Sequence, residues 1–200
     1  NAFITQTVKL PYNIYASASA GQMRHNYQED YTFQAIESRW QSVEGNHKIS
    51  IRGSKLKHVD WYTWDKDIYA AKYRYYSPTL DANFGLEYGQ FWRQDKGYKF
   101  TASFNFGDTK LSAYYLNTDV KKAGFQISIP LTPRRDMKPT KFQVKGPESW
   151  TAGLSTKVGG TDNNLRPNTA YIPDHMQVLD KIYFNQDRLS ISYIQANLLR

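Results

Sequence analysis

The sequence predicts an all-β fold, an antiparallel meander of roughly nine to eleven strands. The prediction depends first on Tyr98–Pro130, where apolar and polar residues alternate with a period of two in three consecutive segments. The turns between these segments, at Gly107-Asp108 and Lys121-Lys122, are short. Short turns join antiparallel neighbours, whereas parallel strands need long crossovers. Such a meander could form a soluble sandwich or barrel, or one wall of an outer-membrane barrel.

The two sides of this meander differ strongly in polarity. In a membrane barrel the apolar side would face lipid and the polar side the lumen, whereas in a soluble sheet the apolar side would face a protein core. The lipid-facing candidates are Phe100, Phe104, Phe125, Ile127 and Ile129, and the lumen-facing candidates are Ser103, Asn105, Ser112, Gln126 and Ser128.

Alternation also predicts strands before the meander, separated by segments rich in turn residues. Two of them, Tyr31–Trp40 and His47–Lys57, should form a hairpin across the turn at Glu44–Asn46. The polar segment Gln22–Asp30 is expected to be a loop. The remaining predicted strands are Tyr12–Gly21, Ile68–Tyr76 and Leu80–Phe91.

The pattern weakens after Pro130. Residues 131–149 and 159–188 are rich in turn residues and are expected to be loops. Short strands are expected at Lys141–Lys145, Trp150–Val158 and Leu189–Leu198. Residues 1–200 are therefore interpreted as a single β-barrel domain or as the C-terminal part of a larger barrel protein.

Composition narrows the chemistry. The 200 residues contain no cysteine, which excludes disulfides, thiol nucleophiles and thiolate metal sites. The 16 Tyr, 10 Phe and 5 Trp suit surfaces where apolar and wet regions meet. The formal net charge of +8 favours anionic partners, yet the basic residues are scattered and no nucleic-acid motif is present. Nucleic acid is therefore not an expected partner.

No motif points to catalysis, a metal or a cofactor. The sequence has no phosphate-binding loop, dinucleotide fingerprint or nucleophile elbow, and its four histidines lack metal-ligand spacing. A carboxylate pair such as Glu87 with Asp95 could be imagined for glycoside hydrolysis, but chance pairs of this kind are common. We therefore predict a protein that is not an enzyme, with no catalytic residues, metal or cofactor.

Aromatic and basic residues beside turns form the most suggestive constellation. Such rings could stack on sugars, with arginine pairing to acidic substituents, or could form the aromatic girdle at a membrane interface. The girdle is favoured because these residues lie at strand ends. The candidates are Trp61, Trp64, Tyr75, Trp92 and Arg93.

Three segments in series resemble a known family. They are PYNIYASASAG, LDANFGLEYGQFWRQDKGYKFTASFNFGD and KKAGFQISIPL, which together span Pro11–Leu131. Their order and spacing are similar to the C-terminal region of the YjbH/GfcD family of Gram-negative outer-membrane β-barrel proteins, found in exopolysaccharide and group 4 capsule clusters. The resemblance implies a barrel that serves polysaccharide secretion and brings no catalytic residues.

The expected function is therefore a non-enzymatic conduit or scaffold for exopolysaccharide or capsule secretion in the outer membrane of a Gram-negative bacterium. The expected partners are an anionic polysaccharide, outer-membrane lipid, and periplasmic or outer-membrane secretion proteins. The alternatives are a soluble β-sandwich that binds carbohydrate, a general porin and, least favoured, a hydrolase.

Overall fold

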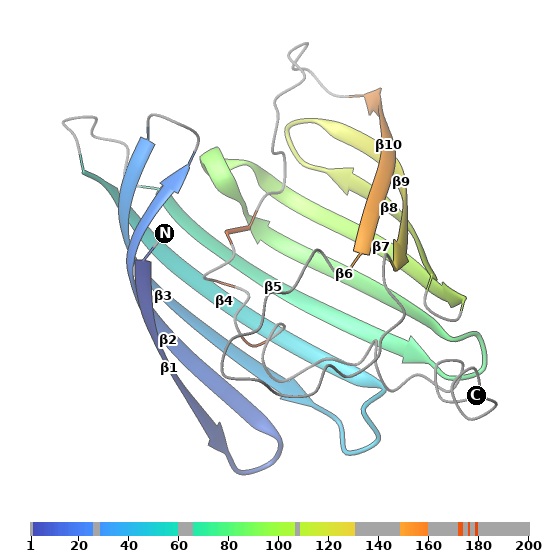
Figure 1. The fold of residues 1–200 in the computed structure, drawn as a ribbon, viewed down its shortest axis with the longest axis horizontal. Helices are drawn as coiled ribbons and strands as arrows, with labels where there is room; N and C mark the ends of the chain where they lie inside the picture. The colour runs from blue at the N-terminus through green and yellow to red at the C-terminus, as the bar shows by residue number, and fades with distance from the viewer. Residues whose placement is uncertain are drawn as a thin grey trace, which may run out of the picture.

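One antiparallel sheet accounts for nearly all of the structure. The computed structural model describes residues 2–25, 29–59, 66–106, 109–130, 149–159, 172–173, 176 and 179. Ten strands follow one another in chain order, each paired with the next. The ends of the sheet curl toward the same side (Figure 1). The all-β meander is confirmed; within the described residues it is an open, barrel-like section, because β1 and β10 are not paired with each other.

The strands are 9 to 13 residues long. Because neighbouring strands are antiparallel, successive connections alternate between the two ends of the strands; the longest connection, residues 131–148, joins β9 to β10. Their bounds are β1 Ala2–Leu10, β2 Ile14–His25, β3 Glu29–Gln41, β4 His47–His58, β5 Lys66–Ser77, β6 Ala82–Gln90, β7 Lys96–Phe106, β8 Thr109–Asn117, β9 Lys121–Pro130 and β10 Ser149–Gly159, with a 3-10 turn η1 at Trp92–Gln94. No helix within these described residues is long and apolar enough to cross a membrane.

The first hairpin turn differs from the sequence prediction. Tyr12 was expected in a strand, but β2 begins at Ile14. Tyr12 and Asn13 have φ angles of 61° and 58°, and the Ile14 N–H donates to the Pro11 carbonyl at 3.4 Å. These features describe a tight turn with two left-handed residues, whose twist matches that of the paired strands. Alternation alone did not reveal this turn because Tyr12 continues the apolar pattern.

The predicted loop Gln22–Asp30 is wrong over most of its length. β2 continues to His25 and β3 begins at Glu29. Arg24 and Asp30 are directly opposite in the ladder, and the guanidinium donates to both carboxylate oxygens at 2.6 and 2.8 Å. Polar residues therefore extend this hairpin, because cross-strand partners of opposite charge stabilise it. The predicted strands Lys141–Lys145 and Leu189–Leu198, and almost all of residues 131–149 and 159–188, lie outside the described residues.

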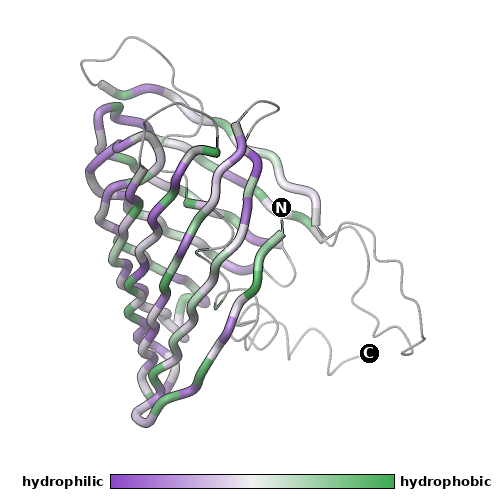
Figure 2. Tube along the Cα trace, turned by 90° about the vertical axis from the view of Figure 1, so that its left-hand side faces the viewer, coloured by the Kyte–Doolittle hydropathy of each residue, from purple (hydrophilic) through white to green (hydrophobic). Residues whose placement is uncertain are grey.

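On β2–β5 buried and exposed residues alternate, and the side with the buried residues is called the inner face and the other side the outer face. Hydrophilic and hydrophobic residues alternate along the tube in Figure 2. On β4 the buried side chains from Lys48 to Ser54 are polar and Leu56 beyond them is apolar, whereas Ile49 and Ile51 are exposed. The register assigns the other strands to the same two faces. The inner face includes Ser17, Ser19, Glu37, Arg39, Lys48, Ser50, Arg52, Ser54 and Glu87, and the outer face includes Ile36, Trp40, Ile49, Ile51, Tyr69, Tyr73, Leu86 and Phe100.

An apolar cluster occupies one end of the inner face. It is centred on Tyr31 and Trp92, whose rings meet edge to face at 5.4 Å between centroids. Residues from far along the chain, Ile172 and Met176, are buried in the same cluster. The full cluster is Met23, Tyr31, Phe33, Ala35, Leu56, Ile68, Ala70, Phe91, Trp92, Ile172 and Met176. Ile172 and Met176 thus contribute to the packing against the inner face.

Candidate functional site: a basic wall on the inner face

Beyond the apolar cluster, the inner face is dominated by cations. The strand order brings lysine and arginine side chains from neighbouring strands onto one patch, where Lys48 is directly opposite Arg74 and Ser50 is opposite Lys72. The carboxylates of Glu37 and Glu87 lie among them. This patch, the basic wall, consists of Arg39, Lys48, Arg52, Lys72, Arg74 and Lys99.

An ion pair across β5 connects two parts of the wall. Arg52 on β4 donates from Nη2 to Oε1 of Glu87 on β6. The residue opposite Arg52 on the intervening strand is Ala70, and its small side chain leaves room for the guanidinium to pass. The side chains of Arg52 and Glu87 are 2% and 9% exposed, so the pair is almost fully buried. Burying both charges is tolerable only because each neutralises the other.

Glu37 organises a second group of contacts. It accepts from Nη2 of Arg39 at 3.2 Å and from the backbone N–H of Leu179 at 3.1 Å. Arg39 in turn donates from Nε to the Ser50 hydroxyl at 3.1 Å. These hydrogen bonds hold a buried arginine in place and fasten a C-terminal residue to the wall.

The wall retains donor capacity. Among the described residues, Nε and Nη1 of Arg52 are buried and have no hydrogen-bond partner. Leaving a buried donor unpaired costs about 1–3 kcal/mol, and more when the group is charged. The more accessible cations of the wall are Lys72, Arg74 and Lys99, which are half-buried, and a surface with this surplus of positive charge is suited to contact with carboxylate or phosphate oxygens.

The outer face has the opposite character. Within the described strands, its charged residues lie near one edge only, in a row called here the charged belt: Arg24, Asp30, Lys55, Lys57, Asp67, Lys96 and Lys121. On β7 the outer-face residues from Tyr98 to Phe106 are all uncharged, a stretch of roughly 26 Å along a strand at about 3.3 Å per residue. A tilt of about 40° makes this roughly 20 Å tall, close to the apolar band of a membrane barrel.

The candidate lipid-facing residues share the outer face. Phe100, Phe125 and Ile129 are exposed, whereas Phe104 and Ile127 are half-buried by their neighbours. The register aligns Phe104 with Leu111 and Ile127 on adjacent strands. The polar candidates Ser103, Asn105, Ser112, Gln126 and Ser128 alternate with them and so lie on the inner face.

The aromatic candidates do not form one cluster in the described structure. Tyr75 lies on the outer face near the end of β5, with its ring 5.2 Å from that of His47. Trp92 is 1% exposed and packs on Tyr31 at the opposite edge of the sheet. Arg93 lies in η1 beside it. Trp61 and Trp64 lie outside the described residues.

The basic wall was not among the predicted sites, although the residue pattern of β4 contains a signal for it. Polar and apolar residues alternate on β4, which predicts a polar side but does not show that this side is buried. Its residues are Lys48, Ser50, Arg52 and Ser54. The described residues also contain no group of His, Asp or Glu able to hold a metal ion. Of the imagined hydrolytic pair, Glu87 binds Arg52 and Asp95 accepts from the Asp119 N–H at 3.2 Å.

Comparison with known proteins adds no relative: no family model, curated protein or solved structure matches the chain.

Proposed function

We propose that this chain forms part of the wall of a bacterial outer-membrane β-barrel that serves exopolysaccharide or capsule secretion as a conduit or scaffold. The observation that carries the proposal is the inverted polarity of the sheet. Its buried inner face holds Arg39, Lys48, Arg52 and Glu87, while Ile36 and other apolar side chains of the outer face are exposed. In a soluble sheet the apolar side is the buried one.

The inversion is suited to a bilayer for a physical reason. A hydrocarbon environment stabilises exposed apolar side chains. Antiparallel strands satisfy one another's backbone hydrogen bonds, and in a bilayer the two edge strands, β1 and β10, would also have to be paired to close a barrel. The charged belt and the tyrosines next to it, Tyr69, Tyr88 and Tyr98, match the order of charged and aromatic residues at a membrane interface. The basic wall supports an anionic polymer as the molecule on the inner side.

The membrane part of the proposal is testable because the chain has no cysteine. Leu86→Cys on the outer face and Thr101→Cys on the inner face would each carry a bimane dye on neighbouring strands. In vesicles containing a brominated lipid, the dye at position 86 should be quenched strongly and the dye at position 101 weakly. Equal quenching at both positions would reject the assignment of the outer face to lipid.

The secretion part needs a separate experiment in the native bacterium. Deletion of the gene should abolish extracellular polysaccharide, and uptake of small solutes should be unchanged. A lysine-to-glutamine change at Lys72 and Lys99 should reduce polysaccharide export without lowering the amount of protein in the outer membrane. Normal export in the deletion strain would contradict the role in secretion, and loss of solute uptake would favour a general porin.

A further inference from the structure

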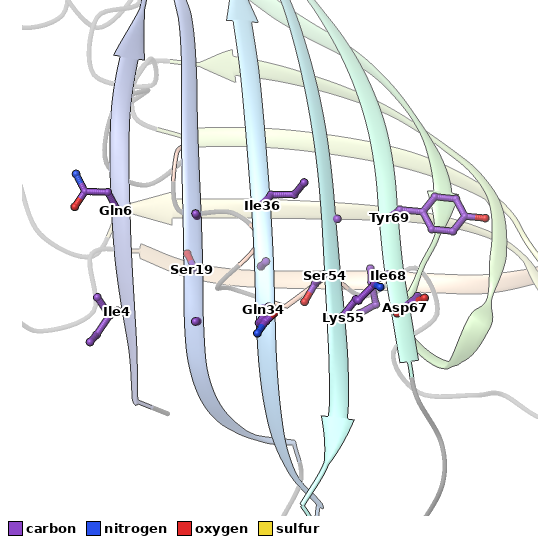
Figure 3. A pocket seen from close by; sticks show the side chains of 14 residues that line it. Ile4, Gln6, Ser19, Gln34, Ile36, Ser54, Lys55, Asp67, Ile68 and Tyr69 are labelled. Carbon is purple, nitrogen blue, oxygen red and sulfur yellow. The ribbon is translucent and has the colours of Figure 1, made fainter.

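We infer that the outer face of β1–β5 carries a binding groove for one anionic glycerophospholipid, an inference that rests on the proposed membrane location. Figure 3 shows this part of the sheet, with Ile4 and Gln6 on β1 at one side, Tyr69 on β5 at the other, and Ile36 on β3 between them. Three adjoining hollows follow the strands here, with volumes of about 540, 740 and 460 Å³.

The first two hollows are mainly apolar and adjoin each other. They share Ala18, Ile36 and Gly53 in their lining. Small residues form the floor, since Ala18 is opposite Ile36 and Ile36 is opposite Gly53. Ile51 and Val8 line the far end of the groove. A depression of this shape between branched side chains offers an acyl chain contacts on several sides, which a flat sheet does not.

The surroundings of Gly53 show that the groove has room for a larger side chain at this position. A Cβ added there would meet its nearest neighbours, the Ile68 carbonyl oxygen and Ile36 Cγ1, at 3.9 and 4.0 Å. These are ordinary van der Waals distances. A larger side chain at position 53 would therefore fill the groove without disturbing the backbone.

The third hollow makes the groove amphipathic. It adjoins the second through Ala20, Gln34 and Lys55, and its lining also includes Lys57. Lys55 and Lys57 lie in the charged belt and have no ion-pair partner within the described residues, whereas Arg24 in the same belt is paired with Asp30.

Asp67 on β5 lines both the second and the third hollow and lies directly opposite Lys55, so the two lysines are opposed by one carboxylate. Positive charge thus predominates where the apolar groove reaches the interface. In a bound phospholipid the acyl chain would lie in the apolar groove and the phosphate headgroup would contact the lysines at its end.

The test uses the full chain, released in a mild detergent and examined by native mass spectrometry with added phosphatidylglycerol or phosphatidylcholine. The wild type should retain one phosphatidylglycerol about tenfold better than phosphatidylcholine, because near-surface lysines attract anionic lipid. Changing Lys55 and Lys57 to glutamine should remove this preference. Changing Lys96 and Lys121, which are in the same belt but outside the groove, should leave it intact.

A second pair of variants tests the groove itself. Gly53→Leu should lower retention of both lipids about tenfold by filling the acyl site. The matched control, Ala113→Leu, changes an exposed outer-face residue of β8 and should have no effect. The inference would be overturned if the wild type retained the two lipids equally, or if both lysine pairs lost the preference equally. It would also be overturned if the chain formed a dimer that Gly53→Leu dissociates.

Failure of this inference is distinguishable from failure of the proposed function. If the dye at position 86 is quenched by brominated lipid and no phospholipid is retained, the groove is not a lipid site and the membrane assignment stands. If neither dye is quenched and the chain remains soluble without detergent, the proposed function and the lipid site fail together.

Discussion

The two faces of β3–β5 are built from the same strands and obey opposite rules. On β4, Arg52 is buried and held by a partner two strands away, while the adjacent Ile51 is 60% exposed. The stability of the polar inner face therefore depends on matched polar partners. The stability of the outer face depends on whether water, detergent or lipid surrounds it. Replacing a charged residue of the inner face by an apolar one, or an apolar residue of the outer face by a charged one, should change the free energy of unfolding. The size of the change should differ between the two faces and between detergent and lipid.

The largest effect is expected from Glu87→Ala on the inner face. It would leave Arg52 buried without its carboxylate, which should destabilise the fold by about 3–5 kcal/mol. The midpoint of urea unfolding in detergent micelles, followed by tryptophan fluorescence, measures the loss. The double change of Arg52 and Glu87 to leucine should recover most of it, because no buried charge then remains. A loss below about 1 kcal/mol in the single variant would show that the pair is solvated.

Ile51→Lys should have the next largest effect, and only in a bilayer. A lysine in the middle of a lipid-facing band costs about 2–4 kcal/mol, measured by urea unfolding from lipid vesicles. Gln22→Lys is the matched control, since Gln22 is exposed on the outer face beside the charged belt, where the cost is about 0–1 kcal/mol. Equal, near-zero costs at both positions would count against lipid contact on the outer face.

A smaller effect is expected where the inner face uses a glycine for packing. A Cβ at Gly124 would overlap the ring of Tyr114 on the neighbouring strand. Gly124→Ala should therefore cost about 1–3 kcal/mol by overpacking. In a chain that already carries Tyr114→Ala, Gly124→Ala should be nearly neutral, and a double-mutant cycle measures this coupling. Additive losses would show that the ring moves away freely.

The smallest effect is expected at the Arg24–Asp30 pair in the charged belt. Both side chains are largely exposed, at 64% and 43%, so water and salt screen their attraction. Asp30→Asn should leave the urea midpoint unchanged at physiological salt. A clear fall in the midpoint would indicate that this edge of the sheet lies in a low-dielectric environment.

Sequence reasoning predicted the features that depend on local alternation. The three strands of the Tyr98–Pro130 meander and the hairpin at Glu44–Asn46 are present, because period-two patterns and turn residues act over a few neighbours. It failed at Tyr12, where an aromatic residue occupies a left-handed turn position. It also failed at Arg24 and Asp30, which looked like loop residues until their partners across the ladder were known.

The candidate site was harder to predict because its members come together only through the register. Arg52 and Glu87 are 35 residues apart and meet across a strand that carries an alanine between them. Trp92 follows a strand end, as a girdle residue would, yet it turns inward onto Tyr31. The spacing of residue types alone shows neither which side chains are buried nor toward which face of the sheet they point.

The hydrogen bond from Leu179 to Glu37 has a consequence for the order of folding. Every neighbouring pair in the sheet is also consecutive in the chain, so the ten strands can assemble hairpin by hairpin with little loop-closure entropy. The Leu179–Glu37 contact spans 142 residues, so it closes a far longer loop than any hairpin does. We therefore expect Leu179 to reach Glu37 after the early hairpins have formed, and a truncation before residue 172 should leave those hairpins able to form while Glu37 loses the Leu179 N–H.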